Sequence, residues 1–171
     1  RSLSYTLTLK PNLKWQDGQP LTADDVVFTF NKLLDAKQHS FFRSMFTYGD
    51  KPVQVSKVDD RTVKFTLPQV SAAFTGTLVQ IYPIPQHVFA GEGDLEKSSK
   101  NDAPVGSGPF KFKEYRAGQY YALTRFDDYW NGKAKLDSVT YRFAKDSNAA
   151  NLALQNGEIN LKMVDPQDVN R

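Results

Sequence analysis

The residues of this chain that could take part in chemistry are paired carboxylates, two histidines and a serine between glycines. The carboxylates are Asp17, Asp24, Asp25, Asp59 and Asp60. Such groups can perform acid–base catalysis, but each of these aspartates occupies a position typical of a turn or of the start of a helix. The histidines, His39 and His87, are far apart and have no companion cluster of ligands. We therefore predict no catalytic residue, no metal site and no cofactor.

The serine stands in the run from Pro104 to Pro109, which reads Pro-Val-Gly-Ser-Gly-Pro. This run lacks the lysine of a phosphate-binding P-loop and the Gly-x-Ser-x-Gly spacing of a nucleophile elbow. Two glycines between prolines instead predict a tight bend with a rigid segment on each side. Because the bend leads into a predicted strand, its backbone could face a ligand cleft, and we take Ser107 and Gly108 as candidate ligand contacts.

Aromatic residues crowd the segment from Phe41 to Tyr48, which has no clean helical or strand period. One interpretation is a loop folded back onto the core. The other is an aromatic wall beside a ligand cleft, since such side chains line many pockets. On the second interpretation, Phe46 and Tyr48 would contact a ligand. Trp15 and Trp130 could also stack on a ligand, but each stands beside a turn, which favours core packing for both.

The stretch from Trp15 to Phe30 predicts a strand end, a tight turn and a helix. Asp17-Gly18 is a turn dipeptide, because glycine accepts a positive φ and aspartate can bond its own backbone. Thr22 is placed to cap the helix, with Asp25 as its capping-box partner. Apolar residues then follow at helical spacing and form one face that would pack on a core: Val26, Val27, Phe30, Leu33 and Leu34.

Alternating apolar and polar residues predict strands at 4–10, 53–58, 62–67, 110–115, 119–126 and 136–143, and a short one at 159–161. In the strand at 110–115, Phe112 is expected on one side and Tyr115 on the other. Short helices are predicted at 71–79, 86–89 and 147–156, and a polar surface loop with a helical turn near Leu95 at 90–102. This combination predicts an α/β fold of the mixed α+β kind.

The composition excludes several classes of protein. The 171 residues carry 22 basic and 19 acidic side chains, a net charge of +3, and the basic residues are scattered. This distribution does not indicate a nucleic-acid surface. Cysteine is absent, so disulfides and thiolate chemistry are excluded. No apolar run reaches the roughly 18 residues that a membrane-spanning helix needs.

The stretch from Trp15 to Phe30 resembles the signature segment of the extracytoplasmic solute-binding proteins of family 5. These are the oligopeptide-, dipeptide- and nickel-binding components of ABC importers. Further segments resemble other elements of this family, in the same order: 58–67, 85–89, 105–112, 125–132 and 153–161. Gln86 stands where the family has lysine, and Ser107 where it has threonine. Together the matches cover nearly the whole chain.

The resemblance implies a lobe of the class II periplasmic binding protein-like fold, with a mixed β-sheet flanked by helices and a small β-rich subdomain. Residues 1–79 would form that small subdomain. Residues 80–171 would form the main part of the first lobe, truncated before a second lobe. The helix start at Asp165-Pro166-Gln167-Asp168, three residues after which the sequence stops, also suggests a fragment of a longer protein.

The function that the resemblance implies is the binding of oligopeptides or dipeptides in a cleft between two lobes, followed by delivery to an ABC permease in the membrane. The protein would be a monomer, peripheral to the membrane, in the periplasm or membrane-associated outside a bacterial cell. It would have no nucleic-acid partner and no enzymatic activity. Two alternatives stay open: a ligand-sensing domain of a transcription regulator, or a binding protein for a nickel complex, an oligosaccharide or haem.

Overall fold

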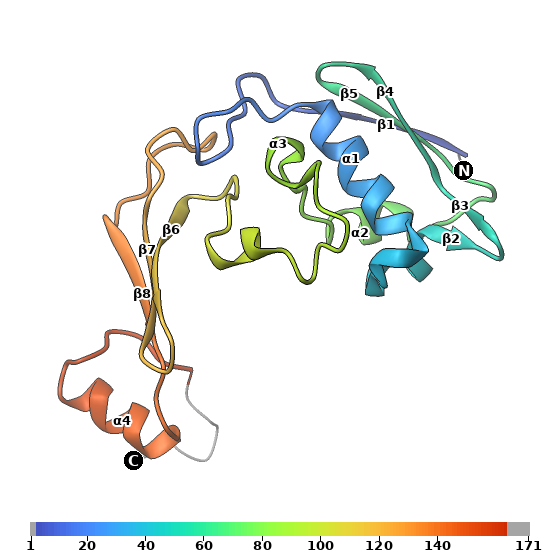
Figure 1. The fold of residues 1–171 in the computed structure, drawn as a ribbon. Helices are drawn as coiled ribbons and strands as arrows, with labels where there is room; N and C mark the ends of the chain where they lie inside the picture. Colours follow the sequence, from blue (N-terminus) through green and yellow to red (C-terminus); the bar gives the residue numbers. More distant parts are fainter. Residues whose placement is uncertain (1–2, 164–171) are drawn as a thin grey trace.

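The computed structural model of the protein describes residues 3–163. Figure 1 shows an elongated arrangement, with β1 (Ser4–Thr8) at one end and α4 (Ser147–Gln155) at the other. Between these ends lies an antiparallel sheet of three strands in the order β6 (Phe110–Arg116), β7 (Tyr120–Arg125) and β8 (Ser138–Arg142).

The first sheet has the order β1-β5-β4, with β4 at Gln54–Asp59 and β5 at Thr62–Thr66. Both pairings are antiparallel, and the register places Leu7 opposite Val63. Val63 and Phe65 are fully buried, because this face of the sheet belongs to the hydrophobic core. The strands predicted at 4–10, 53–58 and 62–67 are confirmed, and the last two pair as a hairpin.

Helix α1 (Ala23–Leu34) supplies the other side of this core. The Thr22 side chain accepts a hydrogen bond from the first turn, and the Asp25 side chain accepts one from the Thr22 main chain, so the predicted capping box is confirmed. Val26, Phe30 and Leu33 of the predicted apolar face are buried, together with Ala23. Val27 and Leu34, also predicted, are partly buried against the core. The Phe30 ring meets Phe46 and Phe65 edge-on, with ring centroids 5.1 Å apart in each pair.

The aromatic-rich segment after α1 forms short pieces of regular structure. These are the 3-10 helices η1 (Ala36–Gln38) and η2 (Phe41–Phe46) and the small hairpin of β2 (Thr47–Tyr48) and β3 (Lys51–Pro52). After β5 come three further short helices, α2 (Phe74–Leu78), α3 (Gln86–Phe89) and η3 (Ser99–Asp102). The first two lie within the helices that the sequence predicts. Leu95 begins a single turn just before η3, because Ser98 N donates to Leu95 O at 3.3 Å.

A bulge in β6 changes which side chains share a face of the second sheet. The register with β7 shifts between Phe112 and Glu114, so Lys113 is an extra residue. Because the extra residue reverses the alternation, the rings of Phe112 and Tyr115 both approach Tyr121, at 5.5 and 6.2 Å between centroids. The prediction that Tyr115 points away from Phe112 is therefore wrong.

Helix α4 follows Asp146, whose side chain accepts a hydrogen bond from Ala149 N at 2.8 Å, and Gly157 has a φ of 74° just after its end. The helix predicted at 147–156 is confirmed, and an aspartate cap and a glycine mark its two ends. The predicted strand at 159–161 does not form, because an extended segment becomes a strand only by pairing and no strand of the described chain pairs with it. The predicted helix start at Asp165-Pro166 lies outside the described residues.

The mixed α+β prediction is confirmed. Every strand pairing among residues 3–163 is antiparallel, so these residues alone do not form the mixed sheet that the resemblance implied. No helix in the same range is long and apolar enough to cross a membrane. The division after residue 79 stays a prediction. Across it, Ile84 N donates to Thr29 Oγ1 in α1 at 2.9 Å, so the two parts are bonded to each other.

Candidate ligand-binding site

Asp25 joins three segments of the chain and is 5% exposed. Its Oδ2 accepts hydrogen bonds from Trp15 Nε1 at 3.1 Å and from the main-chain N–H of Thr22 at 2.9 Å. Its Oδ1 accepts one from the main-chain N–H of Gln86 at 2.9 Å. A buried carboxylate needs such partners in place of water. Asp25 therefore fixes the Trp15 turn, α1 and α3 relative to one another, which is a structural role.

Gln16, the next residue after Trp15, holds the glycine bend that precedes β6. Its main-chain N–H donates to Gly106 O at 2.9 Å, and its Oε1 accepts from Gly106 N at 3.0 Å. Its Nε2 donates to the main-chain oxygens of Gly108 and Phe110, at 3.0 and 2.8 Å. A Cβ on Gly106 would lie 3.3 Å from Gln16 Oε1, so glycine permits this close approach.

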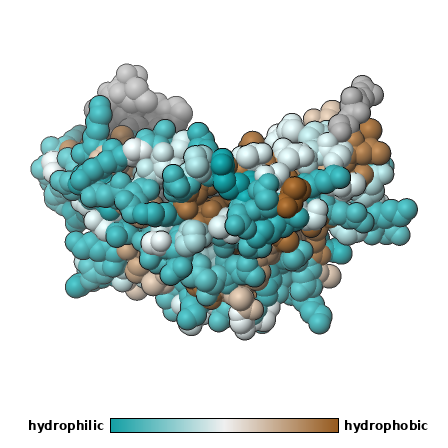
Figure 2. Space-filling model, turned by 90° about the horizontal axis from the view of Figure 1, so that it is seen from above, coloured by the Kyte–Doolittle hydropathy of each residue, from teal (hydrophilic) through white to brown (hydrophobic). Residues whose placement is uncertain are grey.

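A hollow of about 480 Å³ opens beside this bend, and we call it the bend hollow. Its lining includes Gln16, the bend residues Ser107 and Gly108, and the aromatic side chains of Tyr82, Phe112 and Trp130. In the space-filling view of Figure 2 the outline of the molecule dips between its two ends, and hydrophobic side chains are exposed below the dip. The volume of the bend hollow is typical of a pocket for a small molecule or for part of a peptide.

Ser107 and Gly108 bring unpaired polar groups to the bend hollow. The main-chain N–H groups of both residues, and the Ser107 hydroxyl, make no hydrogen bond with residues 3–163. Both residues are partly buried. Because donors shielded from water gain from an acceptor, these groups are suited to binding a carbonyl or carboxylate oxygen of a ligand.

The structure does not bring all four predicted contacts together. Phe46 is fully buried, and its ring meets both Phe30 and Phe74, so it belongs to the hydrophobic core. Tyr48, in β2, is partly buried against the same core. Neither residue lines the bend hollow. The placement of Phe46 agrees with the interpretation of a loop folded back onto the core.

Most residues of the bend hollow were not singled out by the sequence, Gln16 and Tyr82 among them, and one prediction nearby is wrong. Gln16 and Tyr82 line the hollow, and the Tyr82 side chain is 83% exposed, but neither residue stands in a pattern that indicates binding. Core packing is confirmed for Trp15, which is fully buried, but not for Trp130, which is 46% exposed. The reason is that Trp130 lies in a surface loop after β7, where Lys10 Nζ lies 4.2 Å from its ring centroid.

Polar side chains around the Trp15 turn are paired with one another. Asp17 Oδ2 lies 2.5 Å from His87 Nε2, and Lys14 Nζ lies 3.0 Å from Asp128 Oδ2. Partial burial by itself raises the pKa of Asp17, but the hydrogen bonds from His87 and from Gln19 N outweigh it, and the pKa lies below its usual value. Within residues 3–163 there is no group of three or more potential ligands that could hold a metal ion.

Comparison with known proteins decides the family. The model of the bacterial extracellular solute-binding proteins, family 5 Middle, matches residues 2–171. The chain belongs to this family. The resemblance seen in the sequence is thus confirmed, and the members of the family are binding proteins.

The oligopeptide-binding protein AppA of Bacillus subtilis is 40% identical over 170 residues, which are 97% of this chain and 31% of AppA. A structure of AppA from B. subtilis in complex with a nonapeptide has a TM-score of 0.84 at 37% identity, over 92% of this chain and 31% of that one. The ABC transporter substrate binding protein CtaP of Listeria monocytogenes reaches a TM-score of 0.96 at 60% identity, over 98% of this chain and 34% of CtaP.

NikZ from Campylobacter jejuni, solved in complex with Ni(L-His), has a TM-score of 0.83 at 28% identity, over 92% of this chain and 31% of NikZ. The structural neighbours confirm the periplasmic binding protein-like fold class. The chain spans about a third of the length of the relatives that it matches.

Proposed function

We propose that this protein is the substrate-binding component of an ABC importer and that its substrates are peptides. The observation that carries the proposal is the match of 97% of the chain to AppA, an oligopeptide-binding protein whose structure was solved with a nonapeptide. CtaP, which is 60% identical, is a substrate binding protein of an ABC transporter.

The bend hollow supports a peptide as the ligand. Every peptide presents main-chain carbonyl oxygens, and the unpaired N–H groups of Ser107 and Gly108 can donate to them. Such contacts do not depend on the sequence of the peptide. Aromatic walls such as Tyr82 and Phe112 offer apolar surface for side chains of varied shape. We therefore assign this chain as one wall of a peptide cleft, with Ser107 and Gly108 as its ligand contacts; Phe46 and Tyr48 belong to the hydrophobic core and its border instead.

The opposite wall would belong to a second lobe, since the relatives are longer than this chain. The peptide would be captured between the lobes, the lobes would close about a hinge, and the closed form would dock on the permease. On this proposal the protein acts as a monomer, without nucleic acid, in the periplasm or membrane-associated outside the cell.

The test is a native mass spectrum of the full-length natural protein, purified from its host without refolding. We expect a set of added masses that tandem mass spectrometry identifies as peptides. A sugar or haem in place of peptides, or a protein recovered bound to DNA, would contradict the proposal.

For the isolated 171-residue chain we expect weak binding, because one wall buries little of a ligand. The dissociation constant for a peptide such as Ala-Ala-Ala should be in the millimolar range or weaker, roughly −4 kcal/mol. A calorimetric titration measures it, and micromolar affinity would be incompatible with a cleft that needs two walls.

A second candidate ligand is a nickel complex, because the neighbour NikZ was solved with Ni(L-His). A metal that arrives already chelated needs few ligands from the protein. The same native mass spectrum distinguishes the two candidates, since a nickel chelate adds one defined mass with the nickel isotope pattern.

A further inference from the structure

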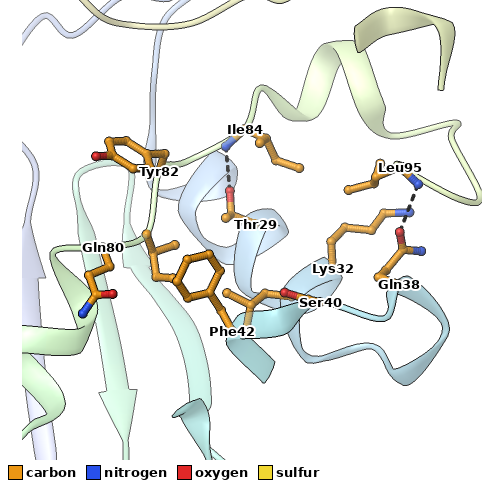
Figure 3. A pocket seen from close by; sticks show the side chains of 11 residues that line it. Thr29, Lys32, Gln38, Ser40, Phe42, Gln80, Tyr82, Ile84 and Leu95 are labelled. Atoms are coloured by element: carbon orange, nitrogen blue, oxygen red, sulfur yellow. Dashed lines mark hydrogen bonds between the residues drawn. The ribbon is translucent and has the colours of Figure 1, made fainter. Parts of the chain in front are cut away.

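A second hollow, of about 330 Å³, lies between α1, the η1–η2 segment and the extended segment before α3. We call it the Lys32 hollow. It shares Tyr82 with the bend hollow, and its other lining residues are different. Figure 3 shows Lys32, Gln38 and Leu95 at one end of this hollow and Gln80 and Tyr82 at the other.

The walls between these two ends are largely apolar. The apolar and aromatic lining residues are Leu33, Phe42, Ile81, Tyr82, Ile84 and Leu95. Phe42 and Ile81 also pack against the hydrophobic core, so part of the wall is anchored from behind. Figure 3 shows Phe42 and Thr29 in the middle of the hollow. An apolar ligand body can therefore lie along the hollow without leaving water trapped against these side chains.

Lys32 is the cationic residue of this lining, and it has unused hydrogen-bonding capacity. Its Nζ donates to the main-chain oxygen of Glu92 at 2.7 Å. No carboxylate of the described chain forms an ion pair with it. An ammonium group has three N–H donors, so at least one is free for a ligand. A partly buried cation next to an apolar wall favours a ligand in which an anionic group is attached to an apolar body.

Two other polar residues of the lining, Gln38 and Thr29, already form hydrogen bonds within the chain. Gln38 Nε2 donates to Gly93 O at 2.6 Å, and Gln38 Oε1 accepts from Leu95 N at 3.1 Å. Thr29 Oγ1 donates to Asp25 O at 2.7 Å and accepts from Ile84 N at 2.9 Å. These bonds position the walls and leave Lys32 as the charged group that a ligand can use.

We propose that the Lys32 hollow binds an apolar group that ends in a carboxylate. The carboxylate accepts hydrogen bonds from Lys32 Nζ, and the apolar body lies along Phe42, Ile84 and Tyr82. This chemistry is offered by a free monocarboxylate and by the C-terminal residue of a peptide with an apolar side chain. The site is separate from Ser107 and Gly108, so it does not depend on the function proposed for the bend hollow.

The experiment is a titration of the ¹⁵N-labelled chain followed by amide chemical shifts. The probes are hexanoate, hexan-1-ol and hexylamine, which share one alkyl chain and differ in the head group. We expect hexanoate to shift the amides of Lys32, Gln38 and Leu95 and to bind about tenfold more tightly than hexan-1-ol, as a hydrogen bond to a charged group implies. Hexylamine should bind more weakly than either probe. Equal binding of the three probes, or shifts elsewhere only, would overturn the proposal.

Lys32→Gln tests the residue itself, with Lys37→Gln as the matched control, because Lys37 lies in η1, beside the hollow, but does not line it. Lys32→Gln should weaken hexanoate about tenfold and leave hexan-1-ol unchanged, which also shows that the hollow remains folded. Unchanged hexanoate binding in Lys32→Gln would overturn the proposal.

A second arm compares the tripeptide Ala-Ala-Leu with its C-terminal amide. If the peptide is the natural source of the carboxylate, the free acid should bind more tightly than both the amide and hexanoate. If a free monocarboxylate is the source, hexanoate should bind more tightly than the tripeptide. If neither the tripeptide nor hexanoate is weakened by Lys32→Gln, the proposal fails for both sources.

Discussion

The chain has two regions that differ in how they bury apolar surface. The first region, up to Ala103, contains every buried hydrophobic residue of the described chain except Ala122 and Phe126. In the second region, from Pro104 to Met163, large apolar side chains stand at the surface, and Tyr115 and Phe143 are 54% and 50% exposed. The first region therefore has a core of its own, and the second is a sheet that displays its aromatic side chains.

This difference suggests how the two regions depend on each other. The contacts that hold the second region to the first include the hydrogen bonds of Gln16, the ion pair of Lys14 with Asp128, and Lys10 above the Trp130 ring. Ion pairs and cation–π contacts at exposed sites contribute about 1 kcal/mol or less each. We infer that the first region sets the stability of the chain and that the glycine bend decides how firmly the sheet is attached.

The largest expected effect is in the core of the first region. Phe30→Ala removes a ring that meets Phe46 and Phe65 and should lower the free energy of unfolding by about 3–5 kcal/mol. Tyr121→Ala removes a ring that meets Phe112 and Tyr115 in the second sheet. Because Tyr121 is partly exposed, the free energy of unfolding should fall by only about 1 kcal/mol.

Urea unfolding followed by circular dichroism measures both variants. If Tyr121→Ala lowers the free energy of unfolding as much as Phe30→Ala does, then the sheet contributes as much to stability as the core of the first region, and the contrast between the regions is wrong. Thr6→Ala, on the side of β1 that is not buried, is a control that should change stability by less than about 0.5 kcal/mol.

A smaller effect is expected where the regions join. Gly106→Ala places a Cβ 3.3 Å from Gln16 Oε1, and Gln16 cannot move away without losing its bonds to Gly108 and Phe110. We expect a loss of about 1 kcal/mol and faster amide hydrogen exchange in β6 and β7, with exchange in α1 unchanged.

Gly108→Ala is the matched control, because no atom lies within 4 Å of a Cβ at that position. It should leave the exchange of β6 close to that of the original chain. Equal exchange in the two variants would show that the contact between Gln16 and Gly106 does not attach the sheet.

The features that the sequence predicts well are those decided by a few consecutive residues. The capping box at Thr22, the turn at Asp17-Gly18 and the hairpin of β4 and β5 each follow from local bonding and alternation, and each is observed. The family signature is also local, which is why the resemblance could be recognised from the stretch between Trp15 and Phe30.

The features that the sequence does not predict depend on contacts between distant residues. Gln16 bonds to Gly106, ninety positions along the chain, and no spacing rule relates them. The bulge at Lys113 depends on the pairing with β7, so strict alternation assigned Tyr115 to the wrong face. The aromatic residues from Phe41 to Tyr48 allowed either a ligand wall or a loop folded back onto the core, and composition could not decide, because burial depends on what packs against each ring.

The smallest expected effect is the pH dependence of the hydrogen bond between Asp17 and His87. Hydrogen bonds hold the Asp17 pKa below its usual value, so the stabilisation by the ionised carboxylate is complete above about pH 4 and is lost as the pH falls through the lower pKa of the folded state. His87→Ala removes one donor and should raise the Asp17 pKa toward its usual value, although the bond from Gln19 N remains. Carboxyl ¹³C chemical shifts across an acid titration measure this pKa directly.

His39→Ala is the control, because His39 lies away from Asp17 and should leave the titration unchanged. An unchanged Asp17 pKa in His87→Ala would show that the bond from Gln19 alone, within the turn, sets it.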